Sequence, residues 1–298
     1  MRAVLGAGHP DRMDPTSVTR ELGGVARTAE LLTLCSHREI VRAVAAGRLV
    51  KVARGRFALP HARRALREAA RLSGTVSHLS AAQVHGWELA RVPELPWVAV
   101  PRNRKVSATD RAAANIVYST ATGHVTDPIR TVLDCARKFD LGEGLTVADS
   151  ALRHKAFDHE ELVAAAEKMR GPGTGRCRRV AREATPLAAN PLESMLRAIA
   201  LDVPGLSVAP QVAVELPGFV VHPDLVDEAL GLVIEAEGFV YHGATPLRFD
   251  RDVERYTKLV LTGRLVVRFT RHHVMEDAEF VRESLTTLVA LRGRRVAA

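Results

Sequence analysis

Two glutamates, Glu235 and Glu237, stand one residue apart in a segment (231–238, GLVIEAEG) that otherwise reads as a buried β-strand. Side chains alternate between the two faces of a strand, so both carboxylates should share one face, opposite Ile234 and Ala236. Two like charges on a mostly buried strand are costly unless a cation neutralises them. The pattern therefore predicts a positively charged partner on that face.

A third acid, Asp224, follows a proline on the preceding predicted strand, where a hairpin would bring it beside Glu235. Carboxylate oxygens gathered in this way suit Mg²⁺ or Mn²⁺, which makes Asp224, Glu235 and Glu237 candidate metal ligands. Two structural alternatives remain open. Asp224 could end a hairpin turn, and the glutamates could pair with Arg251 or Arg255.

The elements that must position these acids occupy residues 187–298. Asn190 and Pro191 suit the start of a helix, with the acid Glu193 in its first turn. Glu193 is thus a candidate for either helix capping or catalysis. The remaining pattern predicts strands at 208–215, 220–225, 230–237 and 265–270, and helices at 251–261 and through 291. This order predicts an α/β sandwich.

The other end of the chain, residues 1–60, has the pattern of a winged helix-turn-helix. Ser36 and Glu39 form a capping box that opens a second helix, and Gly47 is placed to end it. Two short predicted strands, 49–53 and 56–59, then make a hairpin.

The outer face of this module should be cationic, because Arg38 and Arg42 lie four residues apart on the second helix. The hairpin region adds Arg48, Lys51, Arg54 and Arg56. Such residues would contact the phosphates of double-stranded DNA. The alternative is a small helical module with solvated arginines.

Between these parts, residues 61–186 predict a mixed and then mostly helical middle region that ends in a basic linker at 171–182. The expected fold is therefore multidomain α+β, with boundaries near 60/61 and 186/187.

Charge and composition agree with this division. Residues 1–186 carry 30 basic and 19 acidic residues, whereas residues 187–298 carry 12 and 15, so the basic part should meet a polyanion. Three widely spaced cysteines predict neither a disulfide framework nor a zinc knuckle. No signal peptide or long apolar run is evident, and we expect a soluble, cytoplasmic protein with no membrane partner.

The C-terminal motifs together resemble a known family. PD, a spacer and EAE resemble the PD-(D/E)XK nuclease superfamily, and NPLESMLRAIA, VIEAEG, YHG and FDRDVERYTKLVLTGRLVVRFT resemble its very-short-patch-repair-like (Vsr-like) endonuclease branch. The stretch from VARTAELL to RGRFAL, with TDPIRTVLDCAR and VADSALR, resembles the AbiEi family antitoxin of type IV toxin–antitoxin systems.

The resemblance implies a restriction-endonuclease-like sandwich that hydrolyses phosphodiester bonds with Mg²⁺ or Mn²⁺. Asp224 and Glu235 would hold the ion, together with the carbonyl of Ala236. The implied catalytic set also includes Glu193 and His242, and a phosphate-binding residue, Arg255, lies beside it.

One residue departs from the superfamily. Glu237 replaces its usual lysine, and would act as a further metal ligand or mark a site without activity. The sequence therefore predicts a DNA-binding endonuclease or, alternatively, a non-catalytic antitoxin-like transcriptional repressor. The resemblance implies a nucleotidyltransferase-like toxin as a genetically linked partner.

Overall fold

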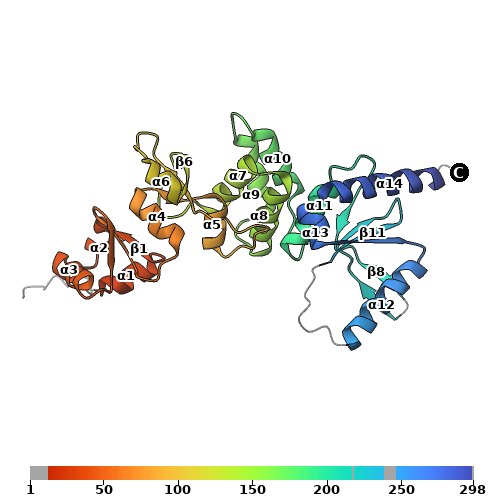
Figure 1. Cartoon of the computed structure of the whole chain (residues 1–298), viewed down its shortest axis with the longest axis horizontal. Helices are drawn as coiled ribbons and strands as arrows, with labels where there is room; N and C mark the ends of the chain where they lie inside the picture. Colours follow the sequence, from red (N-terminus) through yellow and green to blue (C-terminus); the bar gives the residue numbers. More distant parts are fainter. Residues whose placement is uncertain (1–12, 217, 238–245, 297–298) are drawn as a thin grey trace, which may run out of the picture. The chain divides into compact units, whose positions relative to one another are not determined.

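The computed structural model describes residues 13–216, 218–237 and 246–296, and the chain divides into two compact units. The first unit contains Met1–His85 and Val92–Thr131, and the second contains Gly86–Arg91 and Val132–Ala298. Both units mix helices with small sheets (Figure 1), which confirms the predicted α+β class. None of the described helices is both long and apolar enough to cross a membrane.

The first unit is built from short elements in two sheets, ordered β1-β3-β2 and β4-β5-β6. Their bounds are α1 Pro15–Glu21, β1 Val25–Arg27, α2 Thr28–Leu32, α3 His37–Ala45, β2 Val50–Ala53, β3 Arg56–Ala58, α4 Arg64–Leu72, β4 Thr75–Val76, α5 His78–His85, β5 Trp97–Val100, α6 Ala108–Ala113 and β6 Asn115–Tyr118.

Local hydrogen bonds and a glycine explain where α3, the helix next to the first sheet, begins and ends. The Ser36–Glu39 capping box is confirmed, because the Ser36 amide donates to the Glu39 carboxylate at 2.7 Å and the Glu39 amide donates to Ser36 Oγ at 3.3 Å. Gly47 follows the helix with a φ of +69°, a conformation that glycine adopts without strain. Neither α1 nor β1 was predicted, since neither short segment shows a clear apolar period.

Helix α4 joins the two sheets of the first unit. Its buried Leu66 and Leu72 lie in one apolar cluster with Val25 of β1 and Val98 of β5. The two sheets of the first unit therefore share one apolar core.

The second unit contains a helical part followed by an α/β part. Its elements are α7 Pro128–Lys138, which begins in the first unit, α8 Leu141–Arg153, α9 His159–Lys168, α10 Thr174–Glu183, α11 Pro191–Ala200, β7 Ala209–Pro210, β8 Val214–Leu216, β9 Phe219–Val221, β10 Leu225–Asp227, β11 Leu232–Glu237, α12 Pro246–Leu261, β12 Leu265–Thr270, α13 Arg271–Glu276 and α14 Ala278–Val296.

The prediction of a basic linker at 171–182 was wrong for most of that segment. Residues 174–183 form α10, whose Cys177, Val180 and Ala181 are buried while its arginines cover the remaining surface. The spacing of these three small apolar residues places them on one helical face. The contacts group most of α7, together with α8–α10, in one unit with the C-terminal elements, and a boundary at 186/187 stays a prediction.

The α/β part has a sheet ordered β12-β11-β10-β7. Strands β10 and β11 pair antiparallel, and β11 and β12 pair parallel through the crossover helix α12. One apolar cluster combines Leu225 and Ile234 with residues of α11, α13 and α14. A second cluster combines Val226 and Val233 with Leu259 of α12. The central strands are thus covered on both faces.

Candidate functional site

The predicted proximity of Asp224 and Glu235 is confirmed. Leu225 pairs with Ile234 across β10 and β11, so the preceding and following residues, Asp224 and Glu235, lie next to each other at the end of the hairpin. The Asp224 carboxylate accepts the backbone N–H of Ala236 at 2.7 Å. This bond holds Asp224 against the end of β11.

Arginines meet both glutamates of β11. Arg255 of α12 donates from Nη2 to Glu235 Oε1 at 2.5 Å. Arg268 of β12 donates to Glu237, with an Nε–Oε1 distance of 2.6 Å, and the Tyr256 hydroxyl donates to the same carboxylate at 2.8 Å. The Arg268 guanidinium also lies 3.8 Å from the centre of the Tyr256 ring.

Arg255 was one of the two candidate partners named from the sequence, with Arg251, whereas Arg268 was not named. The available signal was that Arg268 is the one charged residue of the strand LVVRFT. Its backbone lies opposite Glu235 in the parallel register of β11 and β12.

Burial raises the pKa of two of the acids, Glu235 and Asp224. Desolvation is the main cause that raises the pKa of Glu235 to about 7, and the neighbouring Asp224 raises it further while Arg255 opposes the shift. Desolvation likewise raises the pKa of Asp224, against the N–H bond from Ala236 and the charge of Arg255. A cation would favour the ionised form of both groups.

Glu193 lies in the first turn of α11, where Asn190 is the N-cap and the Glu193 carboxylate contacts the two residues that precede the helix instead of completing a capping box. Its carboxylate accepts the Ala189 N–H at 2.7 Å and the Asn190 side-chain amide at 2.7 Å. It also accepts from Gln211 at 3.1 Å, a contact that was not predicted. Burial, and next the charge of Asp224, raise the pKa of Glu193, which links it electrostatically to the cluster.

In the described ranges, no group of three or more His, Cys, Asp or Glu side chains is arranged to hold a metal ion. The donor types nevertheless fit a hard cation, since Asp224 and Glu235 offer desolvated carboxylate oxygens on adjacent strands.

Lys258 of α12 pairs with Glu254 at 2.7 Å. His242 lies outside the described residues.

The basic residues of the first unit stand on two elements. Arg38 and Arg42 are exposed on α3, and Lys51 and Arg54 are exposed on or next to β2. Val41, which is 52% exposed, lies between the two arginines of α3 in the sequence. This face combines guanidinium groups with an apolar side chain.

The two remaining basic residues predicted for this surface, Arg48 and Arg56, have different surroundings. Arg48 approaches Asp14 with a distance of 3.5 Å between Nη1 and Oδ1. Arg56 of β3 is half-buried, and its pKa is lowered by burial and by the charges of Arg27 and Arg104.

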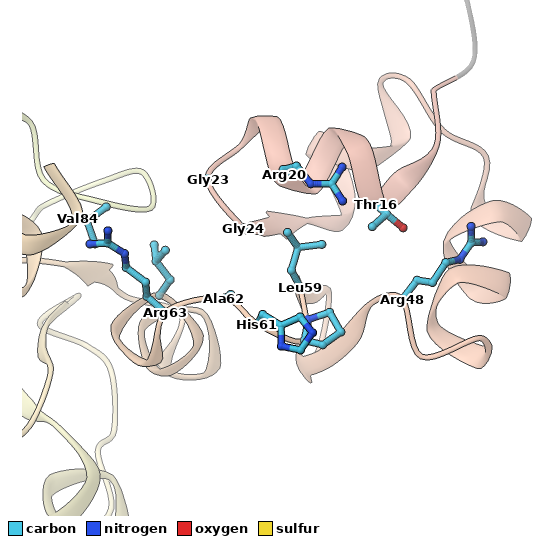
Figure 2. A pocket seen from close by; sticks show the side chains of 12 residues that line it. Thr16, Arg20, Gly23, Gly24, Arg48, Leu59, His61, Ala62, Arg63 and Val84 are labelled. Atoms are coloured by element: carbon cyan, nitrogen blue, oxygen red, sulfur yellow. The ribbon is translucent and has the colours of Figure 1, made fainter. Parts of the chain in front are cut away.

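A separate pocket of about 660 Å³ lies in the first unit (Figure 2) and was not predicted. Its polar lining includes Arg20, Arg48, His61 and Arg63, whereas Leu59 and other apolar residues form much of its wall. None of the described residues that line it is acidic. The pocket therefore has a positively charged lining with an apolar wall.

Comparison with known proteins found a weakly similar solved structure and no sequence match. No protein-family model and no curated protein matches the chain. The crystal structure of the RV2827C protein from Mycobacterium tuberculosis aligns with a TM-score of 0.31 and 13% sequence identity, over 72% of this chain and 93% of that chain.

Proposed function

We propose that this chain is a DNA-binding protein whose C-terminal part is a divalent-metal-dependent endonuclease. The observation that carries the enzymatic part is the pair Asp224 and Glu235, two desolvated carboxylates with raised pKa on neighbouring strands. Burial of two such groups is costly, and a bound cation would offset the cost.

The order of elements supports this proposal. Helix α11 precedes the strands β7, β10 and β11, the crossover helix α12 follows, and β12 pairs parallel with β11. This is the succession that the sequence pattern predicts for an α/β sandwich, and the resemblance to the nuclease superfamily implies that the sandwich is restriction-endonuclease-like. The acids stand on its central hairpin, with Glu193 coupled to them from the first turn of α11.

Each residue then has a role that its position suggests. Asp224 and Glu235 would hold Mg²⁺ or Mn²⁺, and Glu237 would hold Arg268 and Tyr256 in place. Arg255 neutralises Glu235 in the metal-free protein and would be released to meet a phosphate. When bound, the ion would activate water and offset charge on the phosphate.

Metal titration tests the enzymatic part. We expect the full-length protein to bind Mn²⁺ in calorimetry, and Asp224→Asn or Glu235→Gln to weaken binding by about 100-fold or more. Both variants should also lose Mn²⁺-dependent cleavage of duplex DNA. Glu228→Gln is the matched control, because Glu228 is an exposed acid of the same hairpin that pairs with Arg264 at 3.2 Å. A wild-type protein that binds no Mn²⁺ would contradict the proposal.

A second function is favoured by the arginine contacts. Arg255 and Arg268 already neutralise the glutamates of β11, as they would in a purely structural ion network. The chain would then be a non-catalytic, antitoxin-like repressor, with a nucleotidyltransferase-like toxin as its genetic partner. Arg255→Ala separates the two functions: it should tighten Mn²⁺ binding in the endonuclease and only destabilise the fold in the repressor.

Both functions require DNA binding by the first unit. Its order of elements, α1, β1, α2, α3 and the hairpin β2–β3, supports a winged helix-turn-helix with α3 as the recognition helix. The exposed arginines of α3 and the basic hairpin suit a duplex with its phosphates.

We expect Arg38→Ala combined with Arg42→Ala to weaken duplex binding by about 10- to 100-fold. The slope of log affinity against log salt concentration should fall by about 2, because each arginine would otherwise neutralise one phosphate. Fluorescence anisotropy at a series of salt concentrations measures both quantities. Lys168→Ala combined with Arg182→Ala removes the same charge from exposed positions of the second unit and serves as the control. Equal affinities for the two double variants would count against α3 as the recognition helix.

A further inference from the structure

A basic loop lies at the edge of the first unit where β5 and β6 end. These two strands run parallel, so the segments that follow them, 101–107 and 119–126, leave the sheet at the same edge. The first of these segments contains Arg102, Arg104 and Lys105, which are all exposed. We call residues 102–105 the basic loop.

This edge is tied to the module that carries the hairpin β2–β3. His124 Nε2 lies 3.1 Å from Glu30 Oε2, and Arg27 donates from Nη2 to the Gly123 carbonyl at 3.5 Å. The basic loop therefore leaves the sheet on the side that meets β1 and α2.

The charges at this junction are unbalanced. Arg104 and Arg27 lie close enough to Arg56 of β3 for their charges to lower its pKa, after burial as the larger cause. The acid that opposes them is Glu30, whose Oε2 already accepts the backbone N–H of Arg27 at 2.6 Å. An arriving anion would relieve the repulsion among these guanidinium groups.

No contact among the described residues explains why the basic loop is charged. Within the described part of the chain, the side chains of Arg102, Arg104 and Lys105 make no hydrogen bond or ion pair. Three solvated cations beside a second cationic element form a surface typical of phosphate binding.

We propose that the basic loop contacts the phosphates of duplex DNA next to the hairpin β2–β3, and so lengthens the DNA footprint of the first unit. A polyanion fits better than a small anion, because the charges extend from the hairpin residues Lys51 and Arg54 to the loop. The inference rests on the proposed DNA binding and adds a second contact segment to it.

The test compares the triple variant Arg102→Ala, Arg104→Ala, Lys105→Ala with the wild type in anisotropy titrations of a labelled duplex over a range of salt concentrations. We expect the affinity to fall by about 10-fold or more and the log–log salt slope to decrease by about 2 to 3, because each side chain removed would otherwise neutralise one phosphate. Circular dichroism melting should show an unchanged fold, since the three side chains have no described partners.

A matched triple variant, Lys155→Ala, Lys168→Ala, Arg182→Ala, removes the same charge from exposed positions of the second unit and should retain wild-type affinity and slope. If the basic-loop variant behaves like this control while Arg38→Ala with Arg42→Ala weakens binding, the loop inference is wrong and the proposed DNA binding stands. A wild-type protein that binds no duplex at any salt concentration would instead overturn the DNA binding itself.

Discussion

Asp149→Ala is expected to lower the free energy of unfolding of the second unit by about 3–5 kcal/mol, because it leaves a buried arginine without its counter-ion. Asp149 of α8 is 0% exposed and accepts Arg197 Nη2 of α11 at 2.9 and 3.0 Å. Ser194 Oγ and the Thr185 N–H donate to the same carboxylate at 2.7 and 2.8 Å. The substitution removes a buried polar connection between α8 of the helical part and α11 of the α/β part.

Urea denaturation measures this effect through Trp87, a residue of the second unit, in a Trp97→Phe background that removes the other tryptophan of the chain. Asp202→Ala is the matched control. Its carboxylate pairs with Arg179 at 2.7 Å on the surface, and the loss should be about 1 kcal/mol or less. Equal losses for the two aspartates would show that burial of the Asp149 pair has no special weight.

A double substitution separates the charge from the packing. Asp149→Leu with Arg197→Met removes both charges and should recover a large part of the stability that Asp149→Ala loses. Failure to recover it would indicate that the hydrogen bonds from Ser194 and Thr185 dominate.

Glu235→Gln is expected to stabilise the metal-free protein by about 3 kcal/mol at pH 8, the equivalent of the rise in pKa from 4.5 to about 7. The unfolded carboxyl ionises near pH 4.5, whereas the folded carboxyl keeps its proton until about pH 7. The folded state therefore binds more protons in this window. The free energy of unfolding should fall as the pH rises through it and level off above it.

The measurement is urea denaturation of wild type and Glu235→Gln at a series of pH values, with a chelator present. The two curves should meet near pH 4.5 and separate toward pH 8. Asp224 and Glu193 also have raised pKa values and change the wild-type curve in the same direction, so the difference between the two proteins isolates Glu235. Parallel curves would contradict the raised pKa.

If the endonuclease proposal is right, Mn²⁺ should reverse the order of the unfolding free energies of wild type and Glu235→Gln. Mn²⁺ at pH 8 should stabilise the wild type, because it binds the ionised form, and should leave Glu235→Gln unchanged. Glu228→Gln should respond as the wild type does. This readout depends on no catalytic activity.

Much of the fold was predictable from local patterns. The strand at 265–270 and the Ser36–Glu39 capping box agree with the structure because alternation and capping depend on neighbours a few residues away. The error at 171–182 has the opposite cause. Its glycines and arginines resemble a linker, and only packing against α8 and α9 buries the small residues of α10.

The candidate site divides in the same way. The sequence by itself determined that Glu235 and Glu237 share one face of a strand and that Asp224 lies beside them, since both follow from alternation and a short hairpin. Only the tertiary structure decided which cations meet them. The crossover helix α12 and the parallel strand β12 bring Arg255 and Arg268 to β11 from 20 and 31 residues away, and no local pattern encodes that pairing.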